Sequence, residues 1–411
     1  MSKNINKQFK ILYAIAIVLV VISHIPSEAG VSLFYQIFPL YIFNLALFIF
    51  CSGYFYDKEN EEKPFRFIWK KFKRLIIPLY LINIAYGLIA EILTLNGILI
   101  PAKFAVKTSL TGFPMSETFT LGDLFIMPLT NGHQFVYNLA TWFVVPLFIG
   151  YVFLVLFRRL TRRIIKREFI YLIVCVLLGM LGAYLSENGY KYTHLVLLRT
   201  LYFIPFLAAG YYYKAVLEKY DRLSNLAYFS VVVGLQIALI YIMNGTFTYS
   251  VSWGSYSYMA FAGGILGVAF WLRIARLLTP AIGDSPHINK VANSTYSIMA
   301  NHFLGFMLIK YLYYCGQKYF GWFQNFNAQS FRNDVFYFYY PNDIKLSGLL
   351  YVFVAVIFSV WIQDIINITK RRISQNDRYL QTIAFIVFLA IGCFIYIYLM
   401  PFANTVIKNA V

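Results

Sequence analysis

Long apolar runs separated by short polar segments dominate the chain. A helix needs about 20 mainly apolar residues to cross about 30 Å of hydrocarbon. The hydropathy pattern predicts eleven such spans, at residues 9–27, 35–55, 75–94, 138–157, 168–186, 195–213, 225–243, 255–273, 293–313, 347–367 and 381–402. The predicted fold class is therefore all-α, a polytopic transmembrane helical bundle of about ten or eleven spans.

Basic residues are concentrated on alternate connections between these spans. With a cytosolic N-terminus, the cytosolic segments hold 26 of the 35 Lys and Arg residues. These segments are the residues before 11, and 57–74, 158–167, 214–222, 273–290 and 370–378. Because cytosolic loops of membrane proteins are enriched in Lys and Arg, we expect a cytosolic N-terminus.

Composition excludes a water-soluble fold. Hydrophobic residues make up 60% of the chain and charged residues only 13%, whereas about a quarter of the residues in soluble domains are charged. The net charge of +18 is explained by the cytosolic loops and by contact with anionic lipids. No nucleic-acid motif is present, so nucleic acid is not an expected partner. We expect one membrane-embedded domain over residues 1–411, with a core at about 9–367 and an extra C-terminal span at about 381–402.

Several common kinds of site are not expected. Most of the four cysteines lie in apolar runs, which does not indicate a disulfide framework. They are Cys51, Cys175, Cys315 and Cys393. No His, Cys and carboxylate residues fall at metal-ligand spacing, and the P-loop, dinucleotide and serine-hydrolase motifs are absent. We therefore expect no metal and no permanently bound cofactor.

Ionisable residues inside the predicted spans are the main functional candidates, because each costs a few kcal/mol or more to bury in a membrane. Apart from Glu91, which lies close to the outer end of its span, they are His24, Arg199 and His302. At a rise of ~1.5 Å per residue, His24 lies ~21 Å above Lys10, in the outer half of the first span. His302 lies ~14 Å above the start of its span, near mid-membrane.

A simpler interpretation exists for each candidate. A histidine near a membrane interface also serves to bond a backbone carbonyl, and Arg199 also fits a snorkelling side chain. Lys70, Lys73 and Arg74, at the base of the third span, fit topology determinants. The aromatic-rich stretch from Tyr313 to Tyr340 fits either an interfacial belt or a lid that stacks on sugar rings.

Five segments resemble, in order, the motifs of the acyltransferase 3 family of bacterial integral-membrane O-acyltransferases. The apolar run from Lys10 to Ser23-His24 is similar to the opening helix of that family. The other segments are Phe72-Lys73-Arg74-Leu75-Ile76-Ile77-Pro78, Trp142-Phe143-Val144-Val145-Pro146-Leu147-Phe148, the run from Arg199 to Gly210 that contains Phe203-Ile204-Pro205-Phe206, and Asn293-Ser294-Thr295-Tyr296-Ser297-Ile298-Met299-Ala300-Asn301-His302.

The resemblance implies an O-acetyltransferase-like enzyme of the bacterial plasma membrane. It implies transfer of an acyl group, usually acetyl from cytosolic acetyl-CoA, to a hydroxyl of a cell-surface or lipid-linked glycan. Acyl-CoA is then a donor substrate, and the glycan or lipid-linked sugar is the acceptor. A thioester is already activated, so the protein need only align the reactants, remove a proton and stabilise an oxyanion.

The same resemblance implies catalytic roles for three residues. His24 is the expected general base toward the acceptor hydroxyl, because the unperturbed pKa of histidine is near neutral. His302 and Asn301 are expected to orient the donor or to stabilise the developing charge. Direct transfer and an acyl-histidine relay both fit this arrangement.

Substrate-binding roles are implied for a further set of residues. Arg199 is expected to bind an acceptor phosphate or the oxyanion, and Trp142 is expected to be a further substrate-binding residue. Lys70, Lys73 and Arg74 are expected to meet the anionic donor at the cytosolic mouth.

One position departs from the family pattern. Many members carry Arg or Lys eleven residues before the histidine of the first helix, and here that residue is Tyr13. Lys10, about one helical turn below, is expected to take a neighbouring role in donor binding.

Two other classes of protein stay open on the sequence. A transporter of glycan intermediates or of a small solute would use the histidines as proton relays. The chain has neither an internal repeat nor matched broken helices, which argues against this class. A purely structural membrane scaffold is the third option.

Overall fold

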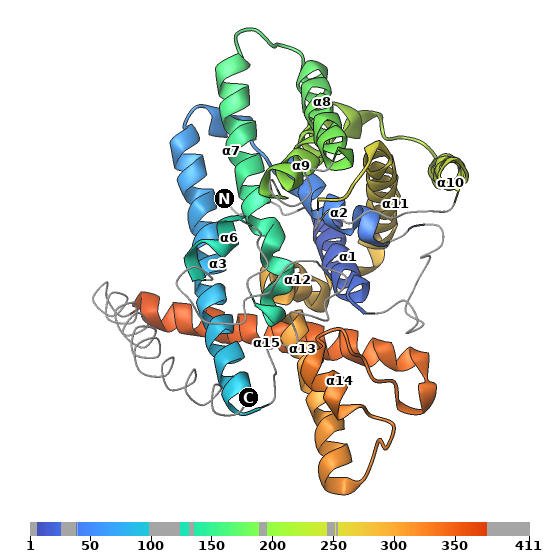
Figure 1. The fold of residues 1–411 in the computed structure, drawn as a ribbon. Helices are drawn as coiled ribbons and strands as arrows, with labels where there is room; N and C mark the ends of the chain where they lie inside the picture. The colour runs from blue at the N-terminus through green and yellow to red at the C-terminus, as the bar shows by residue number, and fades with distance from the viewer. Residues whose placement is uncertain are drawn as a thin grey trace.

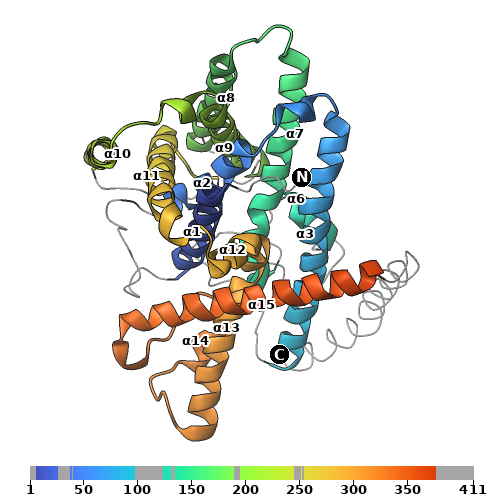
Figure 2. The ribbon, with the colours of Figure 1, turned by 180° about the vertical axis from the view of Figure 1, so that it is seen from behind.

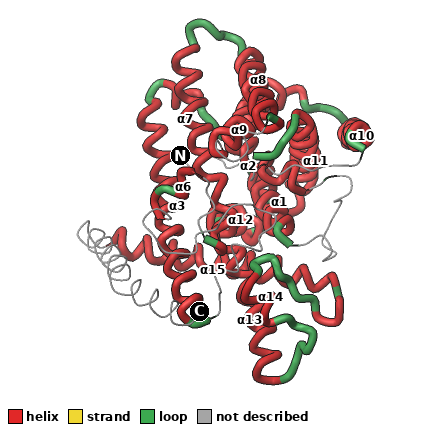
Figure 3. The backbone as a smooth tube through the Cα atoms, viewed as in Figure 1, coloured by secondary structure: helices red, strands yellow, loops and turns green. Residues whose placement is uncertain are grey.

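The computed structural model describes residues 6–25, 38, 40–97, 124–130, 135–188, 195–244, 251 and 254–375. Within these ranges the chain forms helices joined by loops, without a strand (Figure 3). The predicted all-α class is confirmed. The predicted span at 381–402 and most of the loop at 95–137 lie outside the described residues.

Each of the first ten predicted spans coincides with a long helix (Figure 1). The helices are α1 (Lys7–Ser23), α2 (Leu40–Tyr54), α3 (Pro64–Leu95), α7 (Val144–Thr161), α8 (Glu168–Glu187), α9 (Leu195–Tyr212), α10 (Asn225–Ile242), α11 (Tyr258–Ile282), α13 (Thr295–Phe320) and α15 (Gly348–Gln375). Seven helices of the described part are long and apolar enough to cross a membrane. The chain is therefore a multi-pass membrane protein.

Several helix boundaries differ from the hydropathy prediction, among them those of α3, of the fourth span and of α13. Helix α3 begins at Pro64, a residue type favoured in the first helical position, so the basic run at 70–74 lies within the helix and not before it. The fourth span begins as the 3-10 helix η3 (Val136–Phe143), which Asn138 interrupts with φ −113° and ψ 24°. Helix α13 continues to Phe320 and ends at Gly321, whose φ of 68° is left-handed.

Helices α2 and α9 cross with their backbones in direct contact. A Cβ atom on Gly53 would lie 1.9 Å from the carbonyl oxygen of Leu207, and one on Gly210 would lie 1.9 Å from that of Phe50. Small residues allow this close approach between membrane helices. Helix α1 packs against α2, α11 and α13, which places the end of α1 in the interior of the bundle.

The long helices do not share one direction. Helices α3 and α7 run side by side in Figures 1 and 2, whereas α15 lies across them in both views. Helix α10 is seen end-on in both views and packs on α11. Apolar length therefore does not by itself determine how each helix is inclined in the bundle.

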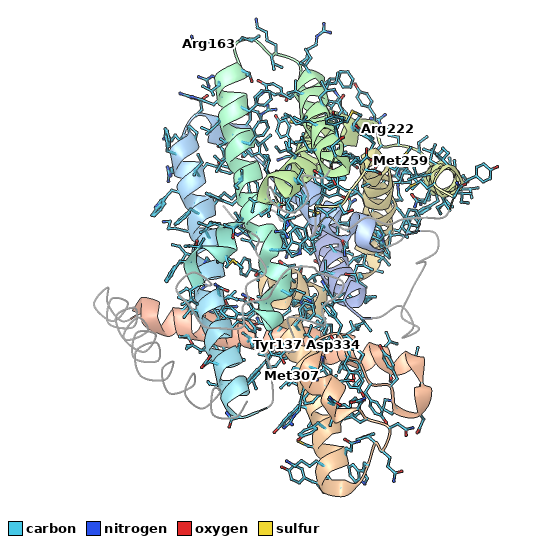
Figure 4. The ribbon with its side chains drawn as sticks, in the orientation of Figure 1. Tyr137, Arg163, Arg222, Met259, Met307 and Asp334 are labelled. Atoms are coloured by element: carbon cyan, nitrogen blue, oxygen red, sulfur yellow. The ribbon has the colours of Figure 1, made fainter. Side chains whose placement is uncertain are left out.

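Ion pairs join segments that the charge pattern places on the same side of the membrane. The pairs include Arg158 with Glu61 and Glu168, Arg273 with Asp221, Lys7 with Asp284, and Lys290 with Asp364. The exposed turn between α7 and α8, where Figure 4 shows Arg163, belongs to the same group of segments. These ion pairs are consistent with the predicted grouping of the segments, and the topology with a cytosolic N-terminus stays a prediction.

Candidate active site

The two histidines singled out in the sequence meet in the structure. His24 directly follows α1, His302 lies within α13, and their ring centroids are 4.9 Å apart at an interplanar angle of 43°. Residue counts along the two helices gave different depths because they assumed a common starting level. Helix α13 instead follows a break at Ser294, after the short helix α12 (Pro286–Asn293), which packs on α1. This offset brings the two rings together.

Backbone hydrogen bonds determine which ring nitrogen of each histidine carries a proton. Nδ1 of His24 lies 2.8 Å from the carbonyl oxygen of Val20, and Nδ1 of His302 lies 3.0 Å from that of Ile298. A carbonyl oxygen only accepts hydrogen bonds, so each Nδ1 carries hydrogen and each Nε2 of a neutral ring presents a lone pair. Nε2 of His302 is buried and has no hydrogen-bond partner among the described residues. Each neutral ring of the pair therefore presents one nitrogen with a lone pair, the chemical requirement for accepting a proton.

Aromatic rings cover one side of the histidine pair. The ring centroid of Phe303 lies 5.0 Å from that of His24 and 4.6 Å from that of His302. The ring of Phe306 lies 5.6 Å from that of His302. An apolar, low-dielectric wall strengthens electrostatic interactions within the site. A charge that develops next to the pair therefore interacts strongly with both rings.

Asn301 is engaged in a hydrogen-bond network and does not point a free amide at the histidines. Its Nδ2 donates to the carbonyl oxygen of Ser297 at 2.7 Å and to the hydroxyl of Ser297 at 3.0 Å. Its Oδ1 accepts a hydrogen bond of 2.7 Å from the hydroxyl of Tyr86 on α3. Both amide hydrogens are used in this arrangement, so the geometry favours positioning of α13 over direct stabilisation of an oxyanion by Asn301.

Replacing Tyr86 by Phe is expected to lower activity by about tenfold while the protein stays folded. The variant removes only the hydroxyl that holds Asn301 next to His302, and it leaves the buried Oδ1 of Asn301 without its donor. The measurement is the rate of acyl transfer by membranes that contain equal amounts of each variant. Tyr80→Phe is the matched control. Tyr80 lies on the same helix, and its hydroxyl donates a hydrogen bond to the carbonyl oxygen of Phe125 at an exposed position. Equal rates for the wild type and Tyr86→Phe would contradict this positioning role.

Further buried polar residues surround the site, and they were not singled out as site residues from the sequence. Nδ2 of Asn138, on η3, donates to Oδ1 of Asn83 at 3.0 Å, and Asn83 lies three residues before Tyr86 on α3. The hydroxyl of Ser23, beside His24, accepts a hydrogen bond of 3.0 Å from Asn44 of α2. A usable signal was present in α3, where two polar residues at a spacing of three interrupt an apolar run and so share one face.

Arg199 and Trp142, predicted as substrate-binding residues, also lie together. Arg199 is fully buried on α9, and its guanidinium carbon lies 4.5 Å from the ring centroid of Trp142 on η3. A guanidinium that stacks on an indole face gains a cation–π interaction. Because η3 packs against α13, this pair belongs to the same region of the bundle as the element that carries His302.

The basic residues of α3 form a separate group nearer the start of that helix. Lys70, Lys73 and Arg74 are exposed, and Lys10 is half-buried on α1. Arg74 lies close enough to Tyr13 of α1 for an electrostatic interaction. The position where α1 lacks the basic residue of the family pattern is therefore within electrostatic range of a positive charge on α3.

A polytopic helical membrane protein in which a buried histidine contacts a half-buried one is the class that the fold and the site define. The family model described as an acyltransferase domain, acyltransferase 3, matches residues 6–368, so the chain belongs to this family and is an acyltransferase. The resemblance predicted from the five segments is thereby confirmed. No curated protein and no solved structure matches the chain.

Proposed function

We propose that the protein transfers an acyl group, most simply acetyl, from cytosolic acyl-CoA to a hydroxyl of a cell-surface or lipid-linked glycan at the bacterial plasma membrane. The observation that carries this proposal is the histidine pair, in which each Nδ1 is tied to a backbone carbonyl and Nε2 of His302 is buried without a partner. Such a pair suits removal of a proton from a hydroxyl.

The reaction needs one proton transfer and one substitution at carbon. Nε2 of His24 takes the proton from the acceptor hydroxyl as the hydroxyl oxygen attacks the carbonyl carbon of the thioester. The new C–O bond forms, the C–S bond breaks, and the thiolate of CoA leaves. The thiolate then receives the proton, which returns the pair to its neutral form. Two positively charged rings 4.9 Å apart would repel each other, so the pair takes up only one additional proton at a time.

The donor side of the proposed site lies at the basic part of α3. Lys70, Lys73 and Arg74 are exposed there, which suits the phosphate groups of CoA. Arg74 interacts electrostatically with Tyr13, and Lys10 lies about one turn before Tyr13 on the same helix. Tyr13 and His24 are eleven residues apart, which puts them on nearly the same face of α1 about 16 Å apart. In this proposal, the extended thioester arm spans that distance along α1 from the basic mouth to the histidines.

Arg199 and Trp142 are the proposed groups for the developing charge or for a phosphate of a lipid-linked acceptor. A buried guanidinium is always charged and donates several hydrogen bonds in a fixed plane, which suits an oxyanion or a phosphate. Asn301 takes a positioning role in this scheme because its amide hydrogens already bond within α13.

The test of the proposed function is transfer of label by membranes. Membranes that contain the protein are incubated with acetyl-CoA labelled in the acetyl group and with de-O-acylated envelope polysaccharide from the source cells. We expect alkali-labile label on the polysaccharide, without any ion gradient, and no label when the protein is absent. A carrier protein would instead need two compartments. Absence of transfer with acetyl-CoA, and with succinyl-CoA as a second donor, would overturn the proposal.

A further inference from the structure

A short strap between α14 (Ala328–Asn333) and α15 connects the outer segment of the chain to the histidine pair. The strap consists of residues 334–340 and begins at Asp334, which Figure 4 labels in the lower half of the view, as it does Met307 of α13. Val335 and Phe338 of the strap are buried, and the aromatic residues between and after them are partly exposed. The strap is thus anchored by two buried side chains, and part of its aromatic surface stays accessible.

A buried lysine holds the strap against α13. The side chain of Lys310 is 1% exposed, and its Nζ donates a hydrogen bond of 2.7 Å to the carbonyl oxygen of Val335. The same ammonium lies 5.0 Å from the ring centroid of Phe338 and interacts electrostatically with Asp334. Oδ1 of Asp334 in turn accepts a hydrogen bond of 2.8 Å from the backbone N–H of Phe336. Lys310 therefore interacts with strap residues that precede Phe336 in the chain, Asp334 and Val335, and with Phe338, which follows it.

A chain of aromatic contacts leads from the strap to the catalytic rings. The ring centroid of Phe336 lies 6.0 Å from that of Phe303, which contacts both His24 and His302. The ring of Phe338 lies 5.4 Å from that of Phe306, which contacts His302. Phe336 is thus one ring away from both histidines and keeps part of its surface open.

Burial of a lysine side chain at position 310 has a high free-energy cost. A buried ammonium loses its hydration, and one hydrogen bond with a ring contact offsets only part of that cost. An apolar side chain would fill the same space more cheaply. A charge at position 310 is explained if the strap must be held at one defined height on α13, since a directional hydrogen bond specifies position better than apolar packing does.

We propose that the strap is the acceptor-side wall of the active site, in which the partly exposed face of Phe336 stacks on a sugar ring of the acceptor and Lys310 is a positioning residue for Phe336. Aromatic faces suit the apolar C–H faces of pyranose rings. By the predicted topology this wall is on the outer side, opposite the basic mouth for CoA. The inference rests on the proposed function and names which part of the chain selects the acceptor.

The experiment separates binding of the acceptor from binding of the donor. Initial rates of transfer are measured with labelled acetyl-CoA while the de-O-acylated polysaccharide is varied, and then the reverse. For Phe336→Leu and for Lys310→Met we expect the KM for polysaccharide to rise by about five- to tenfold, with the KM for acetyl-CoA changed less than about twofold. In Lys310→Met, chymotrypsin is also expected to cleave within 334–340 faster than in the wild type.

Matched controls exist on the same part of the chain. Lys318→Met makes the same change on α13 at an exposed side chain, and Phe320→Leu makes the same change at an exposed ring that stacks on Trp322. Both are expected to match the wild type. Lys310→Arg keeps the charge and the donor and is expected to recover part of the lost acceptor affinity.

Each outcome decides the inference. Unchanged KM for polysaccharide in Phe336→Leu, or a rise confined to the KM for acetyl-CoA, overturns it while the wild-type rate leaves the proposed function intact. If Lys310→Met does not fold, Phe336→Leu still decides, because that variant leaves the bond between Lys310 and Val335 in place. Absence of transfer by the wild type overturns the proposed function itself.

Discussion

His24→Gln is expected to lower the rate of acyl transfer by about 100-fold or more, which is the usual contribution of a general base. Glutamine is close to histidine in size and still hydrogen-bonds, but it cannot take a proton from the acceptor hydroxyl. The rate is measured with labelled acetyl-CoA and membranes that contain equal amounts of folded protein. The KM for acetyl-CoA is expected to change little, because the basic residues of α3 lie at a distance from the pair.

His287→Gln is the matched control for this variant. His287 is an exposed histidine on α12, and its replacement is expected to leave the rate unchanged. His302→Gln is expected to cost a similar factor, and the double variant about as much as either single one, because residues that act as a unit are not additive. A His24→Gln protein with the wild-type rate would remove the catalytic assignment.

Arg158→Met is expected to cause the largest loss of stability, about 3–5 kcal/mol, because it leaves the buried carboxylate of Glu61 without its partner. Nε of Arg158 lies 2.7 Å from Glu61, and Nη1 lies 2.8 Å from Glu168. The guanidinium also lies between the rings of Tyr171 and Tyr211, at 4.4 Å and 4.2 Å. The arginine thus ties the short helix η2 (Lys58–Glu61) to α7, α8 and α9. Thermal unfolding of the purified protein in detergent is the measurement.

Arg162→Met tests whether burial is the cause. Arg162 lies one turn further along the chain and pairs with Glu62 at 2.8 Å, but both side chains are exposed to solvent. An exposed pair contributes about 1 kcal/mol or less, so this variant is expected to unfold at nearly the wild-type temperature. Similar losses for the two variants would show that the network around Arg158 does not stabilise the fold through burial.

The apolar runs and the basic loops predicted most of the architecture. Each of the first ten predicted spans is a helix, because a membrane requires a long apolar segment whose backbone bonds are satisfied internally. Ion pairs such as Arg273 with Asp221 lie between loops that the charge pattern had already grouped together. His24 and His302 were candidates before any geometry was known, since an ionisable side chain in an apolar run needs a reason to be there.

The composition of the site depended on contacts between helices that are far apart in the chain. Tyr86 and Asn301 are separated by 215 residues, and Lys310 meets its partner through a loop that turns back along α13. Each lies in a segment that, taken alone, resembles an ordinary membrane helix with a few polar side chains. Their partners come from other elements, so the local sequence pattern does not predict these pairs.

Sequence alone therefore determined that this protein is a helical, multi-pass acyltransferase-like chain, which helices it has and which histidines are the candidates for the active site. The tertiary structure decided that the two histidine rings touch, that Asn301 bonds to Tyr86, and that Lys310 fastens a strap beside Phe303. The physical reason is that hydropathy acts residue by residue along a helix. Contacts across a bundle depend instead on the offset and crossing of packed helices, which close-packed side chains and small residues such as Gly53 set together.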